Sequence, residues 1–73
     1  MMPIQSDSND YLYITATVVA KTPKAVLLTN ESAKGWVPRS CIHAASDDLI
    51  DDASPGDTIT IKVREWIVDR IGL

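Results

Sequence analysis

Two segments of the chain alternate between apolar and polar side chains, and this alternation constrains the fold more than any other feature of the sequence. In residues 57–64, DTITIKVR, the apolar positions are Ile59, Ile61 and Val63. Residues 11–21, YLYITATVVAK, alternate in the same way, with one set of side chains expected to face inward: Leu12, Ile14, Ala16 and Val18. Because successive side chains of a strand point to opposite faces, both segments are predicted to be half-buried strands.

Two further strands are predicted from turn signals. Residues 24–29, KAVLLT, form a strand that Pro23 separates from the first one, and the two are expected to pair as a hairpin. A polar turn follows, and residues 35–37 form a short strand that Pro38 ends. The predicted sheet is therefore antiparallel and built from short strands.

The second half of the chain contains two segments without strand alternation. We expect one 3₁₀ turn over residues 39–43, followed by a loop over residues 46–57 with a single helical turn capped by Ser46. The last nine residues, EWIVDRIGL, change to a helical period, and Gly72 suits the position just after a helix end. The side chains expected to share the buried face of this short helix are Ile67, Val68 and Ile71.

The chain is long enough for one small domain, predicted over residues 11–73, after a flexible, polar tail over residues 1–10. The sequence has no Phe, two Tyr and two Trp, so the core must be built from aliphatic side chains. A domain of this size buries only about 60% of its unfolded surface, and the lone Cys41 cannot form an intramolecular disulfide. Pairing with a second copy of the chain is one way to add stability, so a homodimer is a predicted state.

Charge and cysteine content limit the environment and the partners. A single thiol and the absence of a signal peptide predict a reducing cytoplasm, and no apolar run is long enough for a membrane span. The formal net charge of −3 disfavours strong non-specific binding of nucleic acid, which needs clustered Lys and Arg. A local basic face is still compatible with this charge.

Short strands and tight turns predict a mainly β fold, a strongly bent antiparallel barrel of four to five strands closed by the C-terminal helix. Within it, residues 35–42, GWVPRSCI, resemble the Gly-x-apolar-Pro-x-x-Tyr-Val stretch of Src-homology-three domains. The resemblance implies a strand end, a 3₁₀ turn and re-entry into the barrel, with Pro38 at the family's groove proline. Cys41 replaces the groove tyrosine, so the resemblance carries the local geometry and not the ligand. The barrel is expected to be of the Src-homology-three type or of the oligonucleotide-binding (OB) type.

A second resemblance covers residues 24–73. The order of KAVLL, a polar turn, GWVPRSCI, an acidic loop, an alternating strand and a terminal EWIVDRIGL is similar to small uncharacterised proteins of tailed phages and prophages. It implies a phage-type origin, a bacterial host cytoplasm and a small β-barrel with a C-terminal helix. It implies no reaction.

The outer face of the bent sheet is the predicted site of binding. Aromatic side chains that stack on bases and cations that contact phosphates are what single-strand binders use, and an ordinary solvated face is the alternative. The candidate binding residues are Tyr13, Trp36, Arg39, Lys62 and Arg64. Trp36 is either a contact anchor or a plug over the C-terminal helix, and the plug is favoured. Trp66 is expected to pack in the core or against a second subunit.

Catalytic and metal-binding chemistry find no support in the sequence. The aspartates of residues 46–57 lack the spacing and the terminal Glu of a calcium loop, and Cys41 with His43 cannot close a zinc site. We therefore expect no enzyme, no cofactor, no metal and no small-molecule substrate. The predicted function is a non-catalytic protein-interaction module of phage or prophage origin, and the alternative is weak binding of single-stranded nucleic acid in phage DNA metabolism.

Overall fold

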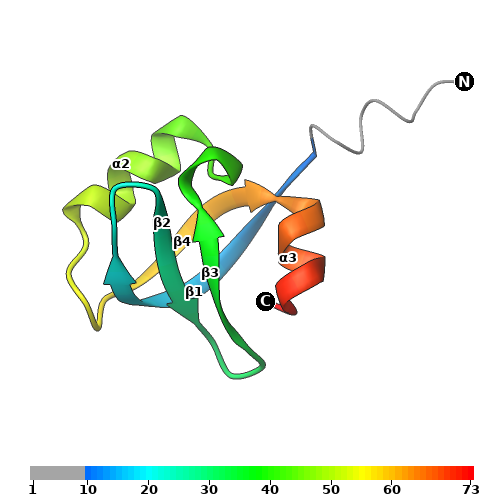
Figure 1. Cartoon of the computed structure of the whole chain (residues 1–73), viewed down its shortest axis with the longest axis horizontal. Coiled ribbons are helices and arrows are strands. Elements are labelled where there is room, and N and C mark those ends of the chain that lie inside the picture. Colours follow the sequence, from blue (N-terminus) through cyan, green and yellow to red (C-terminus); the bar gives the residue numbers. More distant parts are fainter. Residues whose placement is uncertain (1–9) are drawn as a thin grey trace, which may run out of the picture.

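A computed structural model describes residues 10–73 and confirms a mainly β fold with a short C-terminal helix (Figure 1). The antiparallel sheet has four strands in the order β3-β2-β1-β4. The elements, in chain order, are β1 (Tyr11–Lys21), β2 (Ala25–Thr29), β3 (Lys34–Pro38), the 3₁₀ helix η1 (Arg39–Cys41), α2 (Ala44–Asp52), β4 (Thr58–Arg64) and α3 (Glu65–Ile71). The predicted tail lies outside the described residues except for Asp10, whose carbonyl accepts a hydrogen bond from the Glu65 N–H at 3.0 Å.

Strand β1 changes partner halfway along its length. Its first part, Tyr11–Thr17, pairs with β4, and its last part pairs with β2 from Thr17 to Lys21. The register shifts between Val18 and Ala20, where β1 carries one more residue than β2. Such a bulge bends a strand and increases its twist. The two halves of β1 therefore belong to differently directed parts of one curved sheet.

The predicted alternation holds in the core. Val18, Ile61 and Val63 have no exposed surface, and the core contains no aromatic side chain. At the ends of the buried face, Leu12 is 38% exposed and Ile59 is partly buried. The residues buried in the core are Ile14, Ala16, Val18, Val26, Leu28, Val37, Cys41, Ile42, Ile50, Ala53, Ile61, Val63, Ile67 and Val68.

The chain leaving β3 returns to the far edge of β4 through η1, as the sequence predicted for residues 39–43. Ile42 forms an isolated antiparallel bridge with Val63. The His43 N–H donates to the Lys62 carbonyl at 3.0 Å, and the Lys62 N–H donates to the buried Ser46 hydroxyl at 2.8 Å. These contacts provide hydrogen-bond partners for main-chain groups along the outer edge of β4. The sheet itself is open, with β3 and β4 as its two edge strands. Among the described residues, no helix is long and apolar enough to cross a membrane.

The prediction of a loop over residues 46–57 is wrong, because a nine-residue helix, α2, occupies much of it. Its N-cap is His43, whose Nδ1 accepts a hydrogen bond from the Ala45 N–H at 3.3 Å, and Ser46 lies inside the helix. Ile50 is fully buried against the sheet. The last turn contains no basic residue and ends in two aspartates, which oppose the helix dipole. The stabilisation must therefore come from outside the helix.

Lys21 supplies this stabilisation. Its ammonium donates hydrogen bonds to three carbonyls at the end of α2, those of Ile50 at 3.2 Å, Asp51 at 3.1 Å and Ala53 at 2.6 Å. Lys21 is opposite the buried Val26 in the β1 and β2 register. Because opposed residues share a face, the register shift is what turns this cation toward the helix-covered side of the sheet.

The predicted C-terminal helix is confirmed as α3. Ile67 and Val68 are buried and Ile71 packs against the core. A Cβ atom added to Gly35 would lie 2.6 Å from Cγ2 of Ile71, so the glycine allows α3 to approach β3 closely. Gly72 has a φ of 92°, the left-handed end expected from the sequence. Trp66, however, is 45% exposed, so of the two expected positions, in the core or against a second subunit, the core is wrong.

Replacing Lys21 by Met tests how α2 is held. The change keeps most of the aliphatic stem and removes the three hydrogen bonds, so we expect the free energy of unfolding in urea to fall by about 1–3 kcal/mol. Amide hydrogen exchange within α2 should also accelerate. The control is Lys24→Met in the exposed turn after β1, for which we expect a change of less than about 0.5 kcal/mol. Equal stability of the two variants would contradict the assigned role of Lys21.

Candidate functional site

The outer face of β1 and β4 brings together two tyrosines and two cations. The register places Tyr11 opposite Arg64 and Tyr13 opposite Lys62. The Lys62 ammonium lies 5.8 Å from the ring centroid of Tyr11 and 5.7 Å from that of Tyr13. The Arg64 guanidinium carbon lies 5.1 Å from the Tyr11 centroid. These distances are within the range of cation–π interactions. We call Tyr11, Tyr13, Lys62 and Arg64 the aromatic–cation cluster.

The cluster is held from one side and open on the other. The ring of Tyr11 meets His43 edge-on, with centroids 5.5 Å apart, and the main chain of Lys62 is fixed by His43 and Ser46. Tyr13 is 72% exposed. Its ring is thus largely exposed to solvent, with the Lys62 ammonium over it.

Threonines continue the same face along both strands. The hydroxyl groups of Thr15 and Thr60 lie 2.9 Å apart, and those of Thr17 and Thr58 are also 2.9 Å apart. We call these two cross-strand pairs the threonine ladder. From Tyr11 to Thr17 the face is about 20 Å long at the usual rise per residue of a strand.

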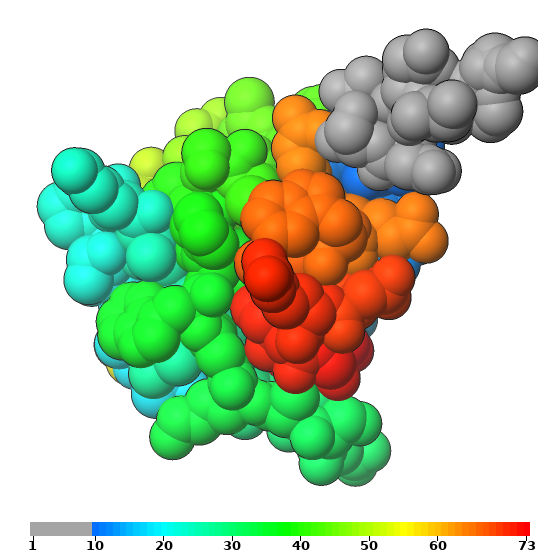
Figure 2. All heavy atoms as spheres, turned by 45° about the vertical axis from the view of Figure 1, so that its right-hand side comes forward, coloured from blue at the N-terminus to red at the C-terminus, as the bar shows by residue number. Residues whose placement is uncertain are grey.

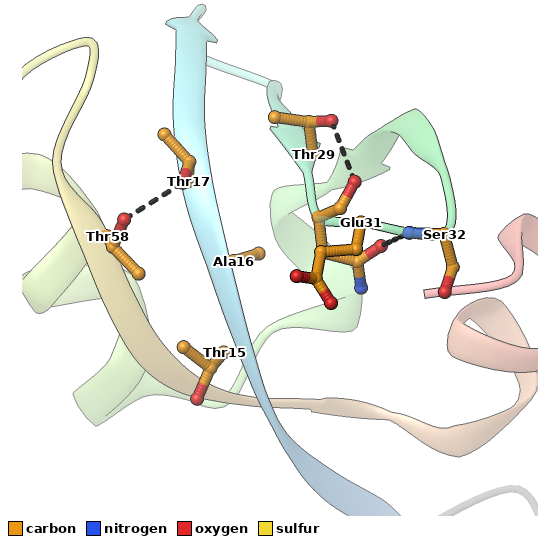
Figure 3. A pocket seen from close by; sticks show the side chains of 8 residues that line it. Thr15, Ala16, Thr17, Thr29, Glu31, Ser32 and Thr58 are labelled. Atoms are coloured by element: carbon orange, nitrogen blue, oxygen red, sulfur yellow. Dashed lines mark hydrogen bonds between the residues drawn. The ribbon is translucent and has the colours of Figure 1, made fainter.

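A hollow with a volume of about 590 Å³ opens at the end of the ladder. It exists because β2 pairs with β1 only from Thr17 onward, so the β2–β3 turn stands away from the first half of β1. Figure 3 shows the threonines of β1 and β4 on one side of it, and Thr29, Glu31 and Ser32 on the other. The residues that line it are Thr15, Ala16, Thr17, Thr29, Asn30, Glu31, Ser32 and Thr58.

The turn that carries Glu31 is fixed by its neighbours. The side-chain oxygen of Asn30 accepts hydrogen bonds from the N–H groups of Ser32 at 2.8 Å and Ala33 at 3.0 Å. The side-chain NH₂ of Asn30 donates to the Leu73 carbonyl at 3.0 Å. This Asx-turn therefore ties the rim of the hollow to the end of α3.

Arg39 and Trp36 lie apart from the aromatic–cation cluster. The Arg39 guanidinium binds the carboxylates of Asp47 at 2.9 Å and Asp51 at 2.8 Å, and its side chain is 16% exposed. Hydrogen bonds to Asp51 and then to Asp47 raise the pKa of Arg39, so it stays charged while it joins η1 to α2. Trp36 is 48% exposed, so its interpretation as an inner plug is wrong.

Of the candidate residues, the structure thus brings together Tyr13, Lys62 and Arg64. Sequence reasoning missed the hollow and Glu31, because strand alternation carries no signal for where two strands diverge. Comparisons with protein-family models, curated proteins and solved structures found no match. The chemistry of the outer face is therefore the basis for a function.

Proposed function

We propose that the chain is a non-catalytic binding module whose aromatic–cation cluster and threonine ladder bind single-stranded nucleic acid. The observation that carries this proposal is Tyr13, whose ring is 72% exposed with the Lys62 ammonium 5.7 Å from its centroid. Every base has a π-face that can stack on an aromatic ring, and stacking on such platforms contributes about 1–3 kcal/mol per base. The adjacent cations lie where the phosphates of a stacked strand would run.

The threonine ladder extends this surface with hydrogen-bonding groups. In each pair one hydroxyl donates to the other, which leaves the second hydroxyl hydrogen available for a phosphate or sugar oxygen. Only two cations belong to the cluster, and the net charge of the chain is −3. Binding is accordingly weak, and salt weakens it further. From the resemblance to phage proteins we propose a role in phage DNA metabolism in the host cytoplasm. We also propose that the bent sheet is a small barrel of the OB-like or Src-homology-three-like type.

A salt titration tests this function. With a fluorescein-labelled oligo(dT), we expect log K to fall with log [salt] at a slope of about −1.4, from about −0.7 for each of two phosphate contacts. Lys62→Gln should reduce the slope to about −0.7. Tyr13→Ala should raise Kd by roughly 5- to 100-fold through lost stacking, without lowering stability. The measurement is fluorescence anisotropy between 20 and 200 mM salt.

Lys24→Gln is the matched control, because it removes one exposed lysine away from the outer face of β1 and β4. It should leave both Kd and slope close to the parent values. Millimolar binding with no salt dependence, or equal losses in the Lys24 and Lys62 variants, would refute nucleic-acid binding by this face.

A second candidate, the protein-interaction module, is favoured by the two tryptophans. Trp36 is 48% and Trp66 is 45% exposed, although tryptophan is buried on average and is enriched at binding hot spots. They belong to adjacent elements, since α3 packs on β3 at Gly35, and Figure 2 shows α3 against the β2–β3 hairpin. We propose that the partner on this side is a second copy of the chain.

We propose that the two copies meet through side chains and not through pairing of their β3 strands. Strand β3 lies at the edge of the sheet but is short, and it carries Lys34 and Pro38. A proline lacks the N–H that an added strand needs, and an edge lysine opposes strand pairing. The tryptophan side chains are therefore the groups that a dimer would bury.

Light scattering at two protein concentrations tests the dimer. We expect a mass of two chains at high concentration, and the mass of one chain for the double variant Trp36→Ser with Trp66→Ser, because it loses the apolar contact. Leu49→Ser is the control, since it removes a 50% exposed apolar side chain from α2. A monomer at both concentrations, or a double variant that still dimerises, would exclude this contact.

A further inference from the structure

We propose that the hollow beside the threonine ladder is a base-recognition pocket, in which Glu31 selects nucleobases that carry an exocyclic amino group. This inference rests on the proposed binding of single-stranded nucleic acid and assigns it a sequence preference. The volume of about 590 Å³ lies within the range of small-molecule sites.

The hollow lies on the path of a strand that is stacked on Tyr13. Tyr13, Thr15 and Thr17 point to the same side of β1, and each step of two residues covers about 7 Å. The lining of the hollow begins at Thr15. A nucleotide next to the one stacked on Tyr13 therefore reaches the hollow without leaving the outer face of β1.

The backbone of β1 presents a donor and an acceptor to the hollow. The Val18 N–H donates to the Asp57 carbonyl at 2.9 Å, and the Gly56 N–H donates to the Val18 carbonyl at 2.7 Å, so the peptide groups of Val18 face the β4 side. Peptide groups alternate sides along a strand, which directs those of Thr15 to the β2 side. Because the β2 register ends at Thr17, no residue of β2 is paired with Thr15. Its N–H and C=O therefore point to the side of β1 on which the hollow lies.

Glu31 determines what the hollow accepts. It is exposed on the turn that Asn30 holds in place, and it stands across the hollow from β1 (Figure 3). A carboxylate repels phosphate, so the hollow should take the base while Lys62 and Arg64 take the backbone. Glu accepts a hydrogen bond from the amino group of cytosine, and a well-placed contact of this kind gives about 1–3 kcal/mol of discrimination.

The competing occupant of the hollow is an extended peptide that adds to the free edge of β1. It would use the same peptide groups of Thr15. It would not need a carboxylate at position 31, and it would not distinguish one oligonucleotide from another. Base selection that depends on Glu31 therefore separates the two occupants.

The test compares oligo(dC) and oligo(dT) of equal length by fluorescence anisotropy at pH 8 and low salt. For the parent protein we expect Kd to be roughly 5- to 100-fold lower for oligo(dC), because thymine presents a carbonyl where cytosine presents its amino group. Glu31→Gln should bring the ratio of the two Kd values close to one. Asp48→Asn, which removes a carboxylate from the exposed side of α2, should leave the ratio unchanged.

Tyr13→Ala separates the pocket from the proposed function. The variant should raise Kd for both oligonucleotides by the same factor, so the ratio of the two Kd values should stay that of the parent protein. If the parent binds both oligonucleotides equally, or if the Glu31 variant keeps the preference, the base-recognition pocket is refuted. The proposed binding of single-stranded nucleic acid is then still supported. If the parent binds neither, both proposals are wrong.

Discussion

The change of partner along β1 is the constraint on which the rest of the structure depends. One strand pairs with β4 over its first half and with β2 over its second, with the change of partner at Thr17 and a register shift between Val18 and Ala20 inside the second half. The first half carries the tyrosines opposite Lys62 and Arg64. The hollow lies where β2 leaves β1. A straight β1 paired with β2 along its full length would have neither the hollow nor the curvature that lets this small sheet enclose a core.

The same register shift determines how charge is distributed. By turning Lys21 toward α2, it supplies a cation to the C-terminal end of a helix that contains four aspartates. Arg39 binds two of those aspartates from η1. These two cations are used within the fold, so they stabilise α2 rather than a ligand. Lys62 and Arg64 lie beside tyrosine rings on the outer face, which is why a chain of net negative charge can still present a local basic surface.

Most of the sheet could be predicted from the sequence, because a side-chain period of two reports directly on strands with one buried face. Ile61 and Val63 are buried as the alternation requires, and the period change after Arg64 located α3. Helix α2 could not be predicted in this way. Aspartate is a poor helix former, and the groups that stabilise the helix, Lys21 and Arg39, are distant in sequence and depend on a bulge.

The candidate site was predictable in part for the same reason. Alternation placed Tyr13, Lys62 and Arg64 on one face, and pairing of β1 with β4 brought them together. Alternation also predicts that Trp36 points away from the core, because its neighbour Val37 in the strand is buried. The interpretation of Trp36 as a plug failed because it did not follow this alternation. Arg39 lies in a short 3₁₀ turn, where the sequence has no repeating apolar pattern that would predict which way its side chain points. Glu31 becomes a candidate only because it lines the hollow. The hollow arises where β1 and β2 diverge, and this divergence has no signal in the sequence.

Nuclear magnetic resonance titration tests the central claim, that the face created by β1 and β4 is the working surface of the domain. Oligonucleotide added to ¹⁵N-labelled protein should shift the amide signals of residues 11–17, 58–64 and 29–32, and should leave the indole N–H signals of Trp36 and Trp66 in place. Shifts confined to the two indoles and their strand and helix, or no shift at any oligonucleotide concentration, would contradict it.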